Sequence, residues 1–248
     1  MRIETAAYAS RWQGVAPSAK ALFALGGMGA AWVATRPGTL AVLAAVMALT
    51  ALVGARVPPR TYMAVALPPL GFLLLSCLTM LVTPGVDGAW HWAASLNPAV
   101  LPTVERTALR SLAMLAALLG FVLSTPLPDL LALLRRLRTP ELLLDLMALC
   151  YRMLFVLRQA WDDGVTAQRA RLGHASWRHA WRSMGLLAGQ MAVQVWQRAG
   201  ALQMAFDARA GHGALRFLAP VFPHARAQNA RAVLAGAALL AVALGDRL

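Results

Sequence analysis

The sequence predicts an all-α polytopic membrane protein with about five transmembrane helices and three cytoplasmic coupling helices. Of its 248 residues, 59% are hydrophobic and only 13% are charged, which is more apolar surface than a soluble domain of this length would bury. The apolar residues gather in runs separated by basic or proline-containing breaks. We therefore expect an N-terminal transmembrane region of four spans at 1–125, cytoplasmic helices at 126–229 and a C-terminal transmembrane helix at 230–248.

Five apolar runs support this division. They are Ala21–Thr35, Leu40–Val53, Tyr62–Val82, Ser111–Pro128 and Ala232–Leu244. The first two are shorter than the roughly 20 residues that a spanning helix needs. They either cross by thinning the bilayer or form a tight hairpin that does not cross fully. The leader before the first run contains an acid and no A-x-A site follows it, which argues against a cleaved signal peptide.

The distribution of charge predicts which side of the membrane each segment occupies. The net charge is +13, and Lys20 is the only lysine, so arginine supplies almost all of it. Residues 126–229 carry thirteen arginines and six acids, a balance of +7, which places them in the cytoplasm by the positive-inside rule. Counting back through four crossings puts the N-terminus in the cytoplasm too. The cations then divide into an inside group and a smaller outside group: Arg2, Arg11, Lys20, Arg56 and Arg60 against Arg36, Arg106 and Arg110.

Composition also limits the kinds of partner. A basic chain can indicate a nucleic-acid partner, but these arginines lie between apolar runs and not in a soluble domain with exposed aromatic residues. We expect the lipid bilayer as the surroundings and no nucleic acid. Cys77 and Cys150 lie in apolar surroundings without CxxC spacing, so we expect no metal site, no disulfide and no cofactor.

Three helices are expected in the cytoplasmic segment. Asp129–Arg138 has leucines on one face and arginines on the other, which is typical of a helix on the membrane surface. Thr139-Pro140-Glu141 predicts the start of a second helix, with Thr139 as its cap and Pro140 as its first helical residue. The helix is expected to run to Arg171 and to be stopped by Gly173, since glycine tolerates the left-handed turn. A third helix is expected from about Ser176 to Ala210. Its apolar positions recur every three or four residues and predict a packing seam: Trp177, Trp181, Met184, Ala188, Met191, Val195, Ala199, Leu202 and Phe206.

The pattern A-R-x-G-H ends both long helices. Its first copy begins at Ala170 and Arg171 with Gly173, and the second, 38 residues later, at Ala208 and Arg209 with Gly211. An arginine followed by a glycine is an ordinary helix ending. Two copies in one basic segment favour a docking function, in which each arginine binds carboxylates or carbonyl groups of a partner.

At these residues the sequence resembles the transmembrane T component of energy-coupling factor (ECF) transporters, which carries two Ala-Arg-Gly motifs. Tyr8-Ala9-Ser10-Arg11 and Ala167-Gln168-Arg169-Ala170-Arg171 are similar to its cobalt and nickel branch. Leu172 and Ala210 stand where the family often has glycine, and Gly173 and Gly211 follow one residue later.

The resemblance implies a non-catalytic coupling subunit of an ATP-driven importer in the bacterial inner membrane, with cobalt ions as the substrate. The implied partners are two ABC-type ATPase subunits, a substrate-binding S component and a small accessory membrane subunit. The implied ATPase-docking residues are Ala170, Arg171, Gly173, Ala208, Arg209 and Gly211.

Two kinds of alternative remain at this point. The substrate of the same complex could be nickel or a vitamin. A different class of protein, a membrane enzyme or scaffold that binds anionic lipids, would also use an arginine-rich segment. For an enzyme, the acidic pair Asp162-Asp163 makes a poor catalytic site, because adjacent helical residues point about 100° apart.

Overall fold

The computed structural model describes residues 2–81, 100–208 and 222–246, and every regular element within them is a helix. The predicted all-α class is confirmed. The chain divides into two compact units, one of Met1–Leu133 with Ala219–Leu248 and one of Leu134–Leu218.

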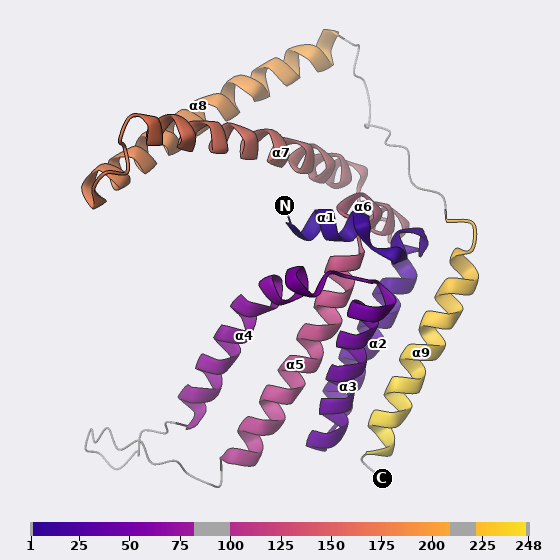
Figure 1. The fold of residues 1–248 in the computed structure, drawn as a ribbon. Coiled ribbons are helices and arrows are strands. Elements are labelled where there is room, and N and C mark those ends of the chain that lie inside the picture. The colour runs from indigo at the N-terminus through magenta and orange to yellow at the C-terminus, as the bar shows by residue number, and fades with distance from the viewer. Residues whose placement is uncertain (1, 82–99, 209–221, 247–248) are drawn as a thin grey trace, which may run out of the picture. The chain divides into compact units, whose positions relative to one another are not determined.

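The first unit holds a short N-terminal helix and the apolar helices (Figure 1). Its elements are α1 (Arg2–Ala9), the 3₁₀ turn η1 (Arg11–Gly14), α2 (Pro17–Val33), α3 (Pro37–Leu49), the π-helical turn η2 (Thr50–Gly54), α4 (Pro59–Leu81), α5 (Leu101–Ser124) and α9 (Ala225–Gly245). The α6 helix (Leu127–Arg136) crosses the boundary between the units, and the second unit contains α7 (Glu141–Ala170) and α8 (Trp177–Ala208).

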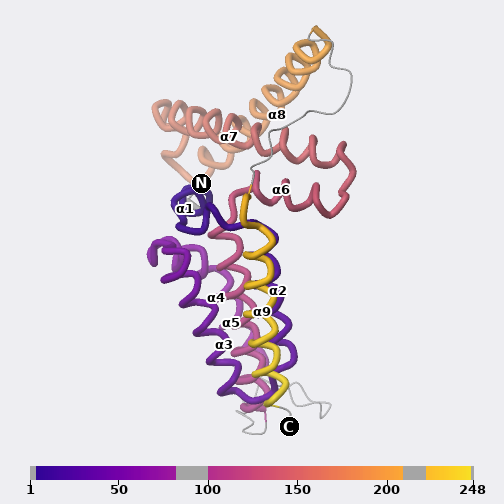
Figure 2. Tube along the Cα trace, turned by 90° about the vertical axis from the view of Figure 1, so that its right-hand side faces the viewer, coloured from indigo at the N-terminus to yellow at the C-terminus, as the bar shows by residue number. Residues whose placement is uncertain are grey.

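Among the residues that the structure describes, four segments are long and apolar enough to cross a membrane: Pro37–Gly54, Pro59–Leu81, Leu101–Ser124 and Ala225–Gly245. The first is α3 extended by η2. The α2 helix has 17 residues, about 25 Å at 1.5 Å per residue, and it runs beside α9 in both views (Figures 1 and 2). Residues 21–53 thus form two separate antiparallel helices that pack among the predicted spans.

Small residues let these helices approach one another closely. A Cβ atom added to Gly26 of α2 would lie 2.7 Å from the Cα atom of Gly236 in α9. Buried alanines dominate the contact between α2, α3, α5 and α9: Ala30, Ala31, Ala34, Ala44, Ala113 and Ala243. Packing through small residues is the usual way for helices to associate in lipid, where apolar burial supplies little net driving force.

Candidate functional site

The first predicted motif lies at the end of α7, where the chain turns into α8 (Figure 1). The helix starts at Glu141, one residue after the expected first helical residue Pro140, and the expected Thr139 cap is wrong. Thr139 Oγ1 donates instead to Leu134 O at 2.9 Å, and Pro140 occupies the N-cap position. Thr139 therefore completes the end of α6.

The end of α7 is a Schellman motif, a pair of backbone hydrogen bonds that satisfies the last carbonyl groups of a helix. Gly173 N donates to Gln168 O at 2.8 Å, and Leu172 N donates to Arg169 O at 3.1 Å. The residue in the left-handed conformation is Leu172, with φ of 56°. The sequence-based expectation that Gly173 supplies the left-handed stop is thus wrong by one residue.

Gly173 has a different role, which is to allow a close contact with α8. Ser183 Oγ donates to Gly173 O at 2.9 Å, and Ser183 is buried. A Cβ atom at Gly173 would collide with Ser183 Oγ and lie 2.9 Å from Gln168 O. The carbonyl of the turn is thus hydrogen-bonded to the second helix of the pair.

Ala170 and Arg171, the other predicted residues of the first motif, are both exposed. Arg171 is the C-cap residue of α7. Its side chain forms no hydrogen bond or ion pair with the part of the chain that the structure describes. Four exposed arginines lie at or near the turn: Arg169, Arg171, Arg178 and Arg182. We call this turn, residues 169–182, the basic tip.

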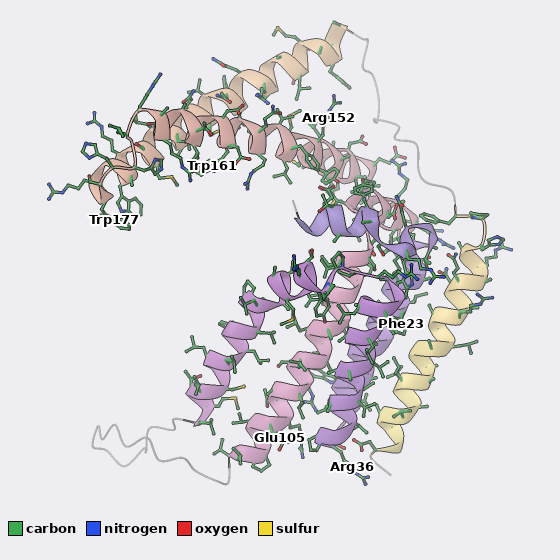
Figure 3. The ribbon with its side chains drawn as sticks, in the orientation of Figure 1. Phe23, Arg36, Glu105, Arg152, Trp161 and Trp177 are labelled. Carbon is green, nitrogen blue, oxygen red and sulfur yellow. The ribbon has the colours of Figure 1, made fainter. Side chains whose placement is uncertain are left out.

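Apolar side chains share the basic tip with the arginines. Leu172 is 74% exposed, Trp177 76% and Trp181 64%. The two tryptophan rings contact each other edge to face, with centroids 5.6 Å apart. Figure 3 shows Trp177 at the end of α8 that adjoins the turn. The tip therefore presents an aromatic pair, a leucine and several guanidinium groups on one short segment.

Most members of the predicted seam along α8 are exposed. The least exposed positions form a stripe that shares only Met191 and Leu202 with the seam: Ala180, Ser183, Leu187, Met191, Gln194, Arg198 and Leu202. Leu187 of α8 packs against Gly164 of α7. The contact is so close that a Cβ atom at Gly164 would collide with Leu187 Cδ1. Ser183 and Gly164 thus mark the contact between the two helices, and most of the larger apolar side chains of the expected seam are left outside it.

The second copy of the motif lies mostly outside the described residues. Ala208 is exposed and is the last described residue of α8. Arg209 and Gly211 fall outside the residues that the structure describes, so their docking role stays a prediction.

A buried cation in the first unit was not predicted as a structural element. Lys20 is 3% exposed, and its Nζ atom donates to Ser124 O, the last carbonyl of α5, at 2.7 Å. A cation at a helix C-terminus satisfies an unpaired carbonyl and interacts favourably with the helix dipole. Burial raises the pKa of Asp129, in the first turn of α6, and the Lys20 ammonium group partly offsets that rise. Lys20 thus acts at the joint between α5 and α6, and the one signal for it in the sequence is that it is the single lysine.

The opposite end of the first unit is joined by the carboxylate of Asp246, which no motif in the sequence had indicated. Asp246 Oδ2 accepts hydrogen bonds from Arg36 N at 2.7 Å, Thr39 Oγ1 at 2.8 Å and Thr35 N at 3.0 Å. Burial raises the pKa of Asp246, but these hydrogen bonds and the Arg36 cation outweigh burial and hold that pKa below its ordinary value. Figure 3 shows Arg36 at the end of the unit where α9 also ends. The last turn of the chain therefore caps the N-terminus of α3.

Within the described residues, no group of three or more His, Cys, Asp or Glu side chains has the arrangement of a metal site. Asp162, one of the two acids considered above for an enzyme, pairs with Arg158 Nε at 2.9 Å on the exposed face of α7. That pair is an ordinary contact between residues four positions apart on a helix.

Comparisons with known proteins agree on one family. The model of the CbiQ family, described as cobalt transport protein, matches residues 9–217. The cobalt transport protein CbiQ of Rhodobacter capsulatus is 36% identical over 217 residues, which cover 87% of this chain and 86% of that protein. The cobalt transport protein CbiQ of Salmonella typhimurium is 30% identical over 208 residues, covering 79% and 90%. A chain of Methanocorpusculum labreanum that carries the name fused cobalt transport protein CbiMQ is 28% identical over 182 residues, 70% of this chain and 30% of that one.

Proposed function

The chain belongs to the CbiQ family of cobalt transport proteins, and from this we propose that it is the coupling subunit of an ATP-driven ECF-type cobalt importer. It is a membrane component of cobalt transport with an all-α fold. In the proposed complex, two ABC-type ATPase subunits supply energy, a separate membrane subunit binds the metal, and this chain links the two without catalysing a reaction.

The observation that carries the proposal is the exposed guanidinium group of Arg171 at the end of α7. The Schellman motif and the hydrogen bond from Ser183 hold this helix end in one conformation. A rigid helix end that presents a planar set of donors suits carboxylates or carbonyl groups on a partner. The resemblance to the T component assigns that partner as an ATPase subunit, and Arg209 as the contact to the second one.

One relative is named a fused cobalt transport protein, and the matched segment makes up 30% of its length. This supports a direct association of this chain with another component of cobalt transport. We propose that a substrate-binding subunit packs against the helices of the first unit, together with a small accessory membrane subunit. When the ATPase subunits close on ATP, they would move the ends of α7 and α8 relative to each other, and this motion would tilt the substrate-binding subunit.

The proposed orientation puts the N-terminus on the cytoplasmic side of the bacterial inner membrane. In the first unit, Arg11 N bonds to Ala55 O, and Gln228 accepts from Ala16 N. The N-terminal segment, the end of η2 and the start of α9 thus share one end, and the predicted inside cations lie in these segments. Arg36 and Asp246 mark the other end. An excess of cations on one side is typical of the cytoplasmic face.

Reversal of charge at the two motif arginines tests the proposal. Arg171→Glu with Arg209→Glu should weaken ATPase binding by roughly 2 to 5 kcal/mol per site, about thirty-fold to several-thousand-fold. The measurement is co-purification of the ATPase subunits with the full chain, followed by cobalt uptake in cells. Arg158→Glu is the matched control, because it reverses an arginine of α7 whose exposed pair with Asp162 contributes little.

Full co-purification and full uptake in the double variant would reject the docking assignment. A chain that binds anionic vesicles and stimulates no ATP hydrolysis would favour the lipid-binding enzyme or scaffold. Uptake of nickel or of a vitamin by the intact complex, in place of cobalt, would keep the coupling function and change the substrate.

A further inference from the structure

We infer that Leu172 is an apolar knob which, beside Arg171, enters an apolar hole bordered by carboxylates on the docked ATPase subunit. This inference rests on the proposed function and adds to it a specificity-determining residue and the chemistry of the partner's surface. The predicted motif assigned docking to Ala170, Arg171 and Gly173 and gave Leu172 no role.

The first observation is the backbone of Leu172. Its φ of 56° is in the left-handed region, where the Cβ atom of an L-residue is crowded and glycine is the usual choice. Gly173 stands one position later, and its φ lies outside the left-handed region. A leucine side chain thus occupies the left-handed position of the turn, where glycine would have less backbone strain.

The second observation is that the Leu172 side chain is largely exposed within its own unit. Its side chain is 74% exposed, although its backbone N–H and C=O groups bond to Arg169 O and Ala175 N. Backbone strain of this kind persists at sites where a function uses the strained residue. A strained and exposed leucine is explained if a partner buries it.

Charge identifies the chemistry of that partner. Leu172 belongs to the basic tip, which carries four exposed arginines, and no acid occurs in the sequence between Asp163 and Asp207. A complementary surface must therefore supply carboxylates around the apolar hole. Arginine and tryptophan side chains, both present on the tip, are the residue types most enriched among the contacts that dominate protein interfaces.

The rigid turn favours a protein pocket over a lipid surface. The Schellman motif and the bond from Ser183 to Gly173 place the Leu172 side chain in a defined position before binding, which lowers the entropy cost of docking into a shaped hole. A fluid lipid interface has no fixed hole, so a defined side-chain position gives no comparable advantage in binding to lipid. Trp177 and Trp181 alone would provide an interfacial anchor.

The test compares Leu172→Gly with the wild-type chain, both full-length and purified in detergent. Glycine removes the strain, so the midpoint of thermal unfolding should rise or stay unchanged. It also removes the knob, so the affinity for the purified ATPase subunits should fall about ten- to hundred-fold, the value of one buried leucine. Leu172→Asn, which also accepts the left-handed conformation, should lose the same affinity.

Arg56→Gly is the matched control. Arg56 also has a left-handed backbone, with φ of 53°, but it lies in the first unit. This variant relieves the same kind of strain and should leave ATPase affinity unchanged. Equal losses of affinity in Arg56→Gly and Leu172→Gly would overturn the inference, because the effect would then be general.

The remaining outcomes separate this inference from the proposed function. If Arg171→Glu abolishes ATPase binding while Leu172→Gly retains it, the knob is wrong and the coupling function stands. If both Leu172 variants lower the unfolding midpoint, the side chain stabilises the chain itself and the knob is again wrong. If Leu172→Gly loses affinity only for vesicles containing an anionic phospholipid, the occupant is lipid. A wild-type chain that binds no ATPase subunit overturns both proposals.

Discussion

At many helix ends one glycine both adopts the left-handed conformation and allows a close contact, but here Leu172 does the first and Gly173 does the second. Leu172 takes the left-handed conformation and keeps an exposed side chain, whereas Gly173 brings the turn against Ser183. Because the φ of Gly173 lies outside the left-handed region, its lack of a side chain is needed for space and not for backbone freedom. The two positions therefore respond in opposite directions to changes of side-chain size.

Gly173→Ala should destabilise the chain by about 1 to 3 kcal/mol, since the added methyl group overpacks the contact with Ser183 Oγ and lies 2.9 Å from Gln168 O. The serine hydroxyl can rotate away, but the backbone oxygen cannot. Thermal unfolding in detergent measures the change. Gly185→Ala is the control, because a Cβ atom there meets no atom within 4 Å, and it should be neutral or slightly stabilising in a helix. Equal midpoints for the two variants would contradict the contact.

At the scale of elements, the helices associate through their smallest residues. Gly26 and Gly236 meet where α2 and α9 cross, and Gly164 admits Leu187 where α7 and α8 cross. Larger apolar side chains, such as Trp181 and Trp196, remain exposed on α8. A pattern of large apolar residues therefore marks the faces that lipid or partners can cover, and small residues mark the contacts within the chain.

Gly26→Ala should separate α2 from α9, because its methyl group would lie 2.7 Å from a backbone atom that has no room to move. The expected loss is about 1 to 3 kcal/mol of stability, read from the thermal midpoint in detergent. Gly29→Ala lies one helical turn further along α2, and its Cβ atom would make an ordinary contact of 3.6 Å with Leu240 Cδ2. A comparable loss at Gly29 would show that helix propensity or lipid packing, and not the glycine contact, governs this pair.

At the scale of the whole molecule, residues far apart in sequence join at two ends of the first unit. Lys20 bonds to Ser124 O at one end, and Asp246 binds the turn between α2 and α3 at the other. The Asp246 side chain is only 2% exposed. These contacts link the first helices of the chain to α5 and α9, so the N-terminal hairpin is stabilised by segments that follow it by about 100 to 210 residues.

Asp246 should make stability depend on acid. Its pKa is lower in the folded chain than its ordinary value, so its stabilisation is complete above the unfolded pKa, near 3.9. That stabilisation is lost as the pH falls through the folded pKa. Asp246→Asn should lower the midpoint of thermal unfolding at neutral pH. It should also make that midpoint fall less steeply as the pH is lowered.

Glu105→Gln is the control for Asp246→Asn, because Glu105 is an exposed carboxylate near the start of α5 (Figure 3). It forms none of the hydrogen bonds that hold Asp246, and this variant should leave both the neutral midpoint and its acid dependence unchanged. If the unfolding midpoint of Asp246→Asn fell with pH as steeply as that of the wild-type chain, other groups and not Asp246 would cause the loss of stability in acid.

The sequence by itself determined the helical class, the membrane setting and the approximate bounds of the helices, because apolar run length and cation spacing are local properties of the chain. It also located the helix end at Arg171, since capping preferences act over a few residues. Its expectation that Gly173 takes the left-handed turn was wrong, and of the expected seam from Trp177 to Phe206 only Met191 and Leu202 belong to the least exposed stripe of α8. Only the tertiary structure decided those points. Which side chain faces a neighbouring helix depends on how closely two backbones approach, and Gly164, Gly173 and Ser183 set that distance between α7 and α8.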